Sequence, residues 1–229
     1  MSETKLCPQC AETIQSAAQI CRFCKHRFDA PAGISTTPPK KGISGIVILI
    51  IIVGASVPVI AIIAAIAIPG LLASQRASNE RRASVSLKML AVAEADFRAN
   101  DRDGNQVQDF WVRDVRSLAT MTVNGKPINL IDEGLAHADF TPGMDGAALA
   151  HNGYFVAAIP ADAQGKSYDR GKGRNPEQFA FCTYPATVSS GRMTYIINEE
   201  NRVWAANTGG RPVIRWPADP AAAGWRSLD

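Results

Sequence analysis

The stretch that decides the fold is residues 43–68, which read ISGIVILIIIVGASVPVIAIIAAIAI. No formally charged side chain occurs between Gly42 and Gln75. An α-helix rises about 1.5 Å per residue, so about 20 apolar residues cross a hydrocarbon core of about 30 Å. In lipid the backbone must satisfy its own hydrogen bonds, which favours a helix even for a run this rich in β-branched residues. We therefore expect one transmembrane helix over residues 43–72.

Two other interpretations of an apolar run fit this stretch less well. A secretory signal peptide has a shorter apolar segment close to the first residue, whereas a long segment with its own motif precedes Ile43. A buried helix of a soluble protein is rarely apolar on every face over such a length. We therefore expect a single-pass membrane protein, with membrane lipid as one of its partners.

Four of the five cysteines lie in two short motifs ahead of this run, Cys7-Pro-Gln-Cys10 and Cys21-Arg-Phe-Cys24. In a C-x-x-C turn two thiolates can face one metal ion, and two such turns complete a tetrahedral site. Two adjacent redox dithiols are the alternative. We predict a structural zinc site formed by Cys7, Cys10, Cys21 and Cys24, with no coordination position left for a substrate.

The segment around these cysteines, residues 1–28, resembles the zinc-ribbon family, whose motifs are Cys-Pro-x-Cys and Cys-x-x-Cys-Gly. Pro8 matches the first motif, whereas Lys25 stands where the second has glycine. So short a segment buries little apolar surface, so metal binding would supply most of its folding free energy. Four thiolates favour a reducing compartment, which places the N-terminus in the cytoplasm. A proline-containing linker, residues 29–42, would join this ribbon to the membrane helix.

Charge and composition argue against nucleic-acid binding. The 229 residues carry a net charge of only +3, and an electrostatic footprint for nucleic acid needs a clustered basic face. The basic pairs at residues 40–41 and 81–82 flank the apolar run, where interaction with lipid headgroups is the better interpretation. We expect no nucleic-acid partner.

The sequence also lacks the signatures of common catalytic sites. It contains neither G-x-S-x-G nor H-E-x-x-H, and His137 and His151 stand without a recognisable nucleophile motif nearby. Cys182 lies in an apolar run, where a buried and inert thiol is expected. We predict that the protein is not an enzyme.

Beyond Pro69 the pattern changes to that of an amphipathic helix continuing to about Ala99, after which β-prone runs alternate with turns. We expect strands over residues 154–159, 179–184, 193–197, 202–206 and 213–216, with a hairpin connection at 198–201. This predicts an α+β domain, residues 73–229, in which a small antiparallel sheet packs on one stripe of the helix. The apolar stripe consists of Ala83, Leu87, Leu90, Ala91 and Phe97.

A turn-rich segment follows the predicted end of the helix. Asp101, Asp103, Asn105 and Asp109 occupy positions one, three, five and nine of a calcium-loop pattern. The glycine stands at position four instead of six, and Val112 occupies position twelve, where a glutamate would bind in bidentate fashion. Calcium bound by these four residues is therefore one prediction, and a solvated Asx-rich turn is the other.

The residues Ala64-Ala-Ile-Ala-Ile-Pro69, with Leu71 and Leu72 after them, resemble the N-terminal helix of type IV pilins and type II secretion pseudopilins. In that family a hydrophobic helix passes through such an alanine-rich segment and proline, then becomes an amphipathic rod on which an antiparallel sheet packs. The resemblance implies a bacterial cytoplasmic (inner) membrane protein with an extracytoplasmic domain. It also implies protein partners, either further copies of the chain or a secretion or pilus-like machine.

The family's processing signature is missing. Counted back from Pro69, its glutamate falls at Ile52 and its cleavage-site glycine at Val47. We therefore expect the ribbon to remain attached and do not expect pilin-like polymerisation. A structural or interaction component of such a system is the favoured function, and a transmembrane sensor whose ribbon binds a cytoplasmic protein is the alternative.

Overall fold

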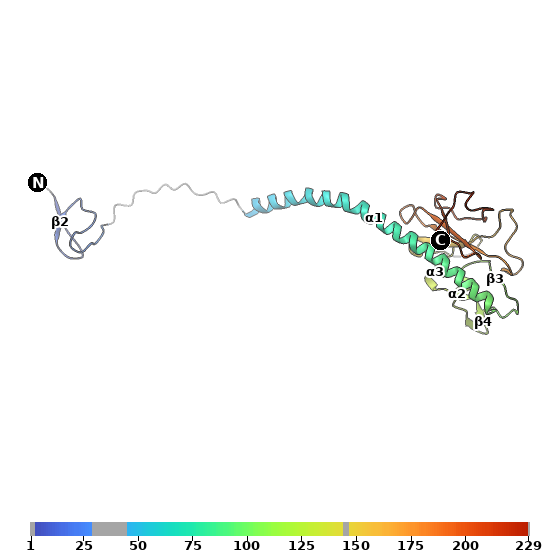
Figure 1. Cartoon of the computed structure of the whole chain (residues 1–229). Helices are drawn as coiled ribbons and strands as arrows, with labels where there is room; N and C mark the ends of the chain where they lie inside the picture. Colours follow the sequence, from blue (N-terminus) through green and yellow to red (C-terminus); the bar gives the residue numbers. More distant parts are fainter. Residues whose placement is uncertain (1–2, 29–44, 144–146, 229) are drawn as a thin grey trace. The chain divides into compact units, whose positions relative to one another are not determined.

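The computed structural model describes residues 3–28, 45–143 and 147–228 (Figure 1), so the predicted linker falls outside the described residues. The chain divides into two compact units, Met1–Pro58 and Val59–Asp229. Each unit has its own hydrophobic cluster. The two units are described separately below.

Helix α1 runs unbroken from Gly45 to Ala99, so it ends at the predicted residue. It is the helix, among the described residues, that is long and apolar enough to cross a membrane. The most apolar window of its described part is not buried against the protein at all. A core helix of a soluble protein would be mostly covered, and this part of α1 is not. The large side chains left exposed here are Ile62, Ile63, Ile66, Ile68, Leu71 and Leu72.

The second half of α1 is buried along one stripe. Every residue of the predicted stripe lies in the main hydrophobic cluster, and Leu87, Leu90 and Phe97 are almost completely enclosed. The same cluster contains side chains from the sheet, among them Phe181 and Ile196. The helix is therefore an integral part of the folded domain from Ala83 onward.

The main sheet has five antiparallel strands in the order β11-β10-β9-β8-β6. Four of them lie within a residue or two of the predicted positions, which confirms those predictions and the α+β class. The hairpin between β9 and β10 closes with the Asn201 N–H donating to the Asn198 carbonyl at 2.9 Å. The strands are β6 (Tyr154–Ala158), β8 (Ala180–Pro185), β9 (Thr194–Asn198), β10 (Trp204–Ala206) and β11 (Arg226–Ser227).

The predicted strand at 213–216 is wrong. This segment has no ladder partner in the described structure, and its Trp216 N–H instead donates to the Ala161 carbonyl at 2.8 Å. Prolines 212 and 217 bracket the segment and lack the N–H that a ladder requires. The edge of the sheet is completed by β11, which pairs with Trp204 and Ala205.

Short elements complete the large unit. Strands β3 (Phe110–Trp111) and β7 (Arg174–Asn175) pair with each other, as do β4 (Thr122–Val123) and β5 (Lys126–Pro127). Helix α2 spans Ser117–Thr120, and α3 spans Glu133–His137. Asp132 caps α3 by accepting the Leu135 N–H at 3.0 Å.

The small unit contains a two-stranded antiparallel sheet, β1 (Thr4–Leu6) and β2 (Thr13–Gln15). Its buried hydrophobic cluster consists of Cys7, Ile14 and Cys21. Two of these three residues are cysteines of the predicted metal site, so the centre of this unit and the site are the same place.

Candidate metal centre and ligand cavity

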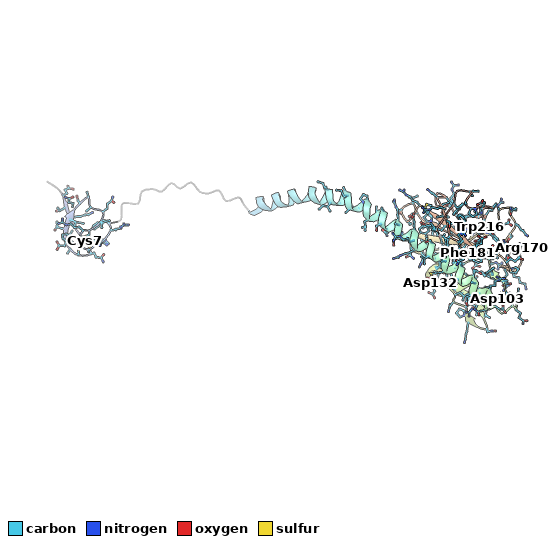
Figure 2. All side chains as sticks on the ribbon, in the orientation of Figure 1. Cys7, Asp103, Asp132, Arg170, Phe181 and Trp216 are labelled. Carbon is cyan, nitrogen blue, oxygen red and sulfur yellow. The ribbon has the colours of Figure 1, made fainter. Side chains whose placement is uncertain are left out.

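The four predicted ligand cysteines come together in the small unit, where Figure 2 labels Cys7. Their sulfur atoms all lie within 4.8 Å of one another, and the Sγ atoms of Cys7 and Cys24 and of Cys10 and Cys21 are each 3.6 Å apart. Sulfur atoms around one zinc ion, bound at about 2.3 Å, are about 3.8 Å apart in a tetrahedron. None of the four forms a disulfide. The cluster therefore has the dimensions of a four-thiolate metal site.

Both C-x-x-C turns have the same backbone geometry. The first cysteine of each accepts the N–H of the residue four positions later at 2.8 Å, which is Ala11 in one turn and Lys25 in the other. It also donates its own N–H to the carbonyl of Glu12 or His26. Ala11 and Lys25 have φ angles of 56° and 60°, in the left-handed region. Lys25 thus adopts the conformation for which the zinc-ribbon pattern uses glycine.

The thiols are not equivalent in acidity. Backbone hydrogen bonds from Cys24 and Phe23 lower the pKa of Cys21 to about 6. At Cys10 a backbone hydrogen bond at Glu12 favours the thiolate, but burial and the three neighbouring cysteines outweigh it and raise the pKa to about 12. Four adjacent thiolates repel one another unless a cation lies between them. The donor set therefore fits a divalent metal ion better than a group of free thiols.

The predicted calcium loop forms an Asx-rich turn beyond the end of α1. Asp101 accepts the N–H groups of Asn105 and Gln106 at 3.0 and 2.9 Å. Asp103, labelled in Figure 2, pairs with the Arg174 guanidinium, and Asp109 accepts from the Asn105 amide at 3.3 Å. These contacts use several of the oxygen atoms that would bind the ion, whereas the buried Oδ1 of Asp109 has no hydrogen-bond partner among the described residues.

One feature of the loop agrees with the calcium pattern. Gln106, at position six, has a φ of 65°, so the chain makes the sharp turn there without the usual glycine. Among the described residues, the four cysteines form a group of potential metal ligands whose ligand atoms all lie within 4.8 Å of one another, and the aspartates of this loop do not. Calcium at Asp101, Asp103, Asn105 and Asp109 stays a prediction.

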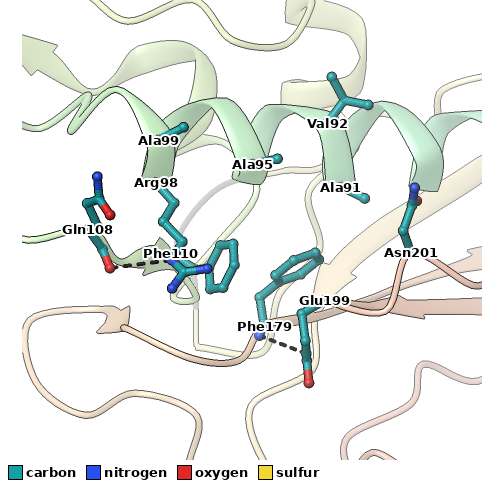
Figure 3. Close-up of a pocket in the computed structure, with 10 residues that line it drawn as sticks. All are labelled: Ala91, Val92, Ala95, Arg98, Ala99, Gln108, Phe110, Phe179, Glu199 and Asn201. Carbon is teal, nitrogen blue, oxygen red and sulfur yellow. Dashed lines mark hydrogen bonds between the residues drawn. The ribbon is translucent and has the colours of Figure 1, made fainter.

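A cavity of about 530 Å³ lies in the large unit between α1 and the hairpin that follows β9 (Figure 3). Alanines on one face of α1 form its floor, and the rings of Phe110 and Phe179, 5.0 Å apart, form a wall. Two charged groups line it: the Arg98 guanidinium stacks 4.9 Å over the Phe110 ring, and Glu199 accepts the Phe179 N–H at 3.3 Å. Its volume suits a small ligand with an apolar part and both charges.

The sequence analysis missed Glu94. This side chain is completely buried in the stripe of α1, and its Oε2 accepts the Trp111 N–H at 2.9 Å while its Oε1 has no partner. Burial raises its pKa well above the usual range. The signal that could have found it is its position, because Leu87, Leu90, Glu94 and Phe97 follow helical spacing.

Cys182 has the predicted inert environment. Its side chain is fully buried, and burial raises its pKa to about 12. A thiol with so high a pKa is protonated at neutral pH and is a poor nucleophile.

Comparisons with known proteins do not assign this chain to a family. The chain matches no protein-family model, and no curated protein or solved structure is significantly similar to it. Functional inference therefore rests on the residues of this chain.

Proposed function

We propose that this chain is a non-enzymatic, single-pass protein of the bacterial cytoplasmic membrane, with a pilin-like domain outside and a zinc ribbon inside. The continuity of α1 carries the proposal. The same helix is apolar and uncovered over residues 61–72 and buried in a folded core from Ala83. A helix of this kind fixes a domain close to the membrane that its first half crosses.

The proposed metal in the ribbon is zinc. Four cysteine thiolates form the typical structural zinc site, which leaves no position for a reacting water molecule. The site would hold together a unit with only three buried hydrophobic residues among those described. Thiolates stay reduced in the cytoplasm, and this supports a topology with the ribbon inside and the folded domain outside.

An exposed seam on α1 supports an interaction role. Val85, Met89 and Val92 are 57%, 45% and 65% exposed and are spaced like the seam of a helix pair. They line, with Leu130, a mostly apolar groove of about 460 Å³, which Lys88 and Asp96 also line. A second copy in the same membrane would present the same seam at the same height, so we propose self-association through this face. The structural role would resemble that of pseudopilins in lateral helix packing.

The first experiment tests the anchor and the intact ribbon. The full chain, expressed in a bacterial host, is expected to stay in the membrane pellet after alkaline carbonate extraction. Mass spectrometry of the purified protein should show a start at Met1 or Ser2 and one zinc per chain. Release by carbonate would overturn the anchor, and a new start near Ile48 would show that the ribbon is removed.

The second experiment tests the seam. Met89→Lys with Val92→Lys should abolish self-association of the detergent-purified chain, measured by analytical ultracentrifugation, because burying two ammonium groups is unfavourable. Ser84→Lys adds one ammonium group beside the seam and serves as the control for added positive charge. A wild-type chain that is strictly monomeric, and that retrieves no secretion-machine component, would count against the proposal.

The cavity at Arg98 and Glu199 favours a second candidate function, that of a transmembrane sensor. In this case a small ligand would bind in the outer domain while the ribbon binds a cytoplasmic protein. Cys7→Ser separates the two functions. It should abolish capture of the cytoplasmic protein in the sensor, and it should leave self-association through the seam unchanged in the structural protein.

A further inference from the structure

A second cavity lies at the end of the domain where α1 enters it. It has a volume of about 520 Å³ and is lined by Arg76 and Arg192 together with Asn207, Val188 and glycines of two loops. The two loops are residues 186–193 and 207–211. Because Arg76 is the first charged residue after the uncharged run, this cavity sits where the apolar helix ends.

Hydrogen bonds fix the first loop to this level of α1. The Arg76 Nε donates to the Ser189 carbonyl at 3.2 Å, and the Asn79 amide donates to the Ser190 carbonyl at 3.0 Å. One turn further, Glu80 accepts the backbone N–H of Arg192 at 2.8 Å. Leu72, with its exposed apolar side chain, is one turn of about 5.4 Å before Arg76. A membrane crossed by the predicted span, residues 43–72, would therefore meet this loop at its headgroup layer.

The charged side chains of the two loops at this end of the domain are all positive. Neither loop contains an aspartate or glutamate, and the first carboxylate of α1 is Glu80. Glu80 accepts the Arg192 backbone N–H through Oε1 and keeps its negative charge, but Arg76, Arg192 and Arg211 outnumber this one carboxylate. Asn207 adds an amide whose Oδ1 accepts the Gly209 N–H at 3.0 Å, which leaves its NH₂ group as a donor.

An apolar side chain stands at the rim of the cavity. Val188 is 85% exposed, the highest value among the large hydrophobic residues described. Water is a poor environment for it, whereas the acyl region beneath a headgroup is a favourable one. Two arginines for a phosphate and one valine for acyl chains match the two parts of a phospholipid.

We propose that this cavity binds the phosphate of an anionic phospholipid, with Arg76 and Arg192 as its ligands and Val188 inserted beside the acyl chains. The inference rests on the proposed membrane anchor. The bound lipid would hold the base of the domain against the membrane and so fix the tilt of α1 relative to it.

The test uses the full chain in detergent with equimolar phosphatidylglycerol and phosphatidylcholine of identical acyl chains, and native mass spectrometry counts the lipids retained. The wild type should prefer phosphatidylglycerol. Arg76→Gln with Arg192→Gln should lower that preference by about fivefold for each arginine. Arg170→Gln is the matched control, because this exposed arginine lies at the far end of the domain from the entry of α1 (Figure 2).

Arg192→Gln alone should lower the preference for phosphatidylglycerol about fivefold. This single variant keeps the Arg76–Ser189 hydrogen bond, so it still tests the proposal if the double variant misfolds. A photo-crosslinking residue at Val188 should label lipid, and one at Arg170 should not. Equal lipid preference in wild type and Arg192→Gln would overturn the inference. Displacement of the lipid by millimolar inorganic phosphate would also overturn it, in favour of a free-phosphate site. Carbonate extraction of each variant separates these outcomes from failure of the anchor itself.

Discussion

Two residues of the ribbon, Ala11 and Lys25, have a left-handed backbone conformation that disfavours side chains with a Cβ atom. Lys25→Gly should therefore stabilise the metal-bound ribbon by about 1 kcal/mol, a cost typical of this conformation. The measurement is the rate at which a chromophoric chelator withdraws zinc, which we expect to fall about fivefold.

Gln9→Gly is the control for this prediction, because Gln9 lies within the first turn and is not among the residues with positive φ. There glycine only adds freedom to the unfolded chain, so zinc release should become faster. If Lys25→Gly also released zinc faster, then the side chain of Lys25 would matter more to the site than its backbone conformation.

Glu94 should make the stability of the large unit depend on pH. Burial raises its pKa, and nearby Asp109 and Asp114 add to the effect. The unfolded chain releases this proton near pH 4.3, whereas the folded chain holds it to a higher pH. Stability should therefore fall as the pH rises from about 4.3 through the folded-state pKa. Glu94→Gln keeps an oxygen for the Trp111 N–H and should be more stable than the wild type at pH 7, because it has no proton to lose.

Urea unfolding of the full chain between pH 5 and 8 measures this effect, with Asp96→Asn as its control. Arg102 lowers the pKa of Asp96 in the folded protein. The stability that Asp96 contributes is therefore lost only when the pH falls below the pKa of an ordinary carboxyl group. The control should leave the slope between pH 5 and 8 unchanged. A Glu94→Gln variant with the wild-type slope would show that Glu94 is ionised in the folded protein.

The four-cysteine cluster could be predicted from the sequence to the individual residue. Helical spacing puts Glu94 on the buried stripe of α1, but its hydrogen-bond partner could not be predicted. Two C-x-x-C turns specify their own local geometry, since each pair of thiolates is brought together by a few neighbouring residues. The burial of Glu94 depends on Trp111, which is distant in the sequence and becomes its hydrogen-bond partner only in the folded domain.

At the scale of elements, α1 combines buried and exposed apolar residues within two turns. Leu90 is fully buried in the core, and Val92 is 65% exposed on the seam. Leu90→Ala should lower the free energy of unfolding by about 2–5 kcal/mol, because it removes packed methyl groups and leaves a cavity. In the monomer, Val92→Ala should change it by less than about 0.5 kcal/mol.

Chemical unfolding followed by tryptophan fluorescence compares these two variants. Equal losses would mean that Val92 is covered, as it would be if the seam were occupied by a second copy. Repeating the comparison at a lower protein concentration separates the two cases, because self-association depends on concentration and folding of a monomer does not.

The strands show where sequence patterns succeed and where they fail. Residues 179–184 and 193–197 are rich in apolar side chains. The strands there begin and end within one residue of the predicted bounds. Residues 213–216 have a similar composition but lie between prolines. The edge position is taken by Arg226–Ser227, a polar pair with no strand signal, because its place is decided by pairing with β10.

For the whole molecule, the order of ribbon, long helix and α+β domain could be predicted from the sequence, since each part has its own periodicity or motif. The cavities could not, because their walls come from segments far apart in the chain. Arg76 and Arg192, for example, share a cavity only because residues 186–193 return to the start of the domain.

Separate hydrophobic clusters in the two units lead to a prediction about metal removal. All four tryptophans lie in the unit Val59–Asp229, so their fluorescence reports on that unit alone. The ribbon contains Lys5, Arg22, Lys25 and Arg27, so trypsin reports on the other. Chelating the metal from the full chain should open the ribbon to trypsin, because few buried residues remain to hold it.

The same treatment should leave the tryptophan melting temperature within about 2 °C of the untreated value, because the metal stabilises only the unit that binds it. Cys7→Ser should reproduce both results without chelator, and Cys182→Ser, which removes the one cysteine of the large unit, should leave the ribbon resistant to trypsin. A large fall in the tryptophan melting temperature on chelation would contradict the independence of the two units. It would equally be the result expected if a metal ion were bound by the aspartates that follow α1, and adding calcium back in place of zinc would then restore the melting temperature.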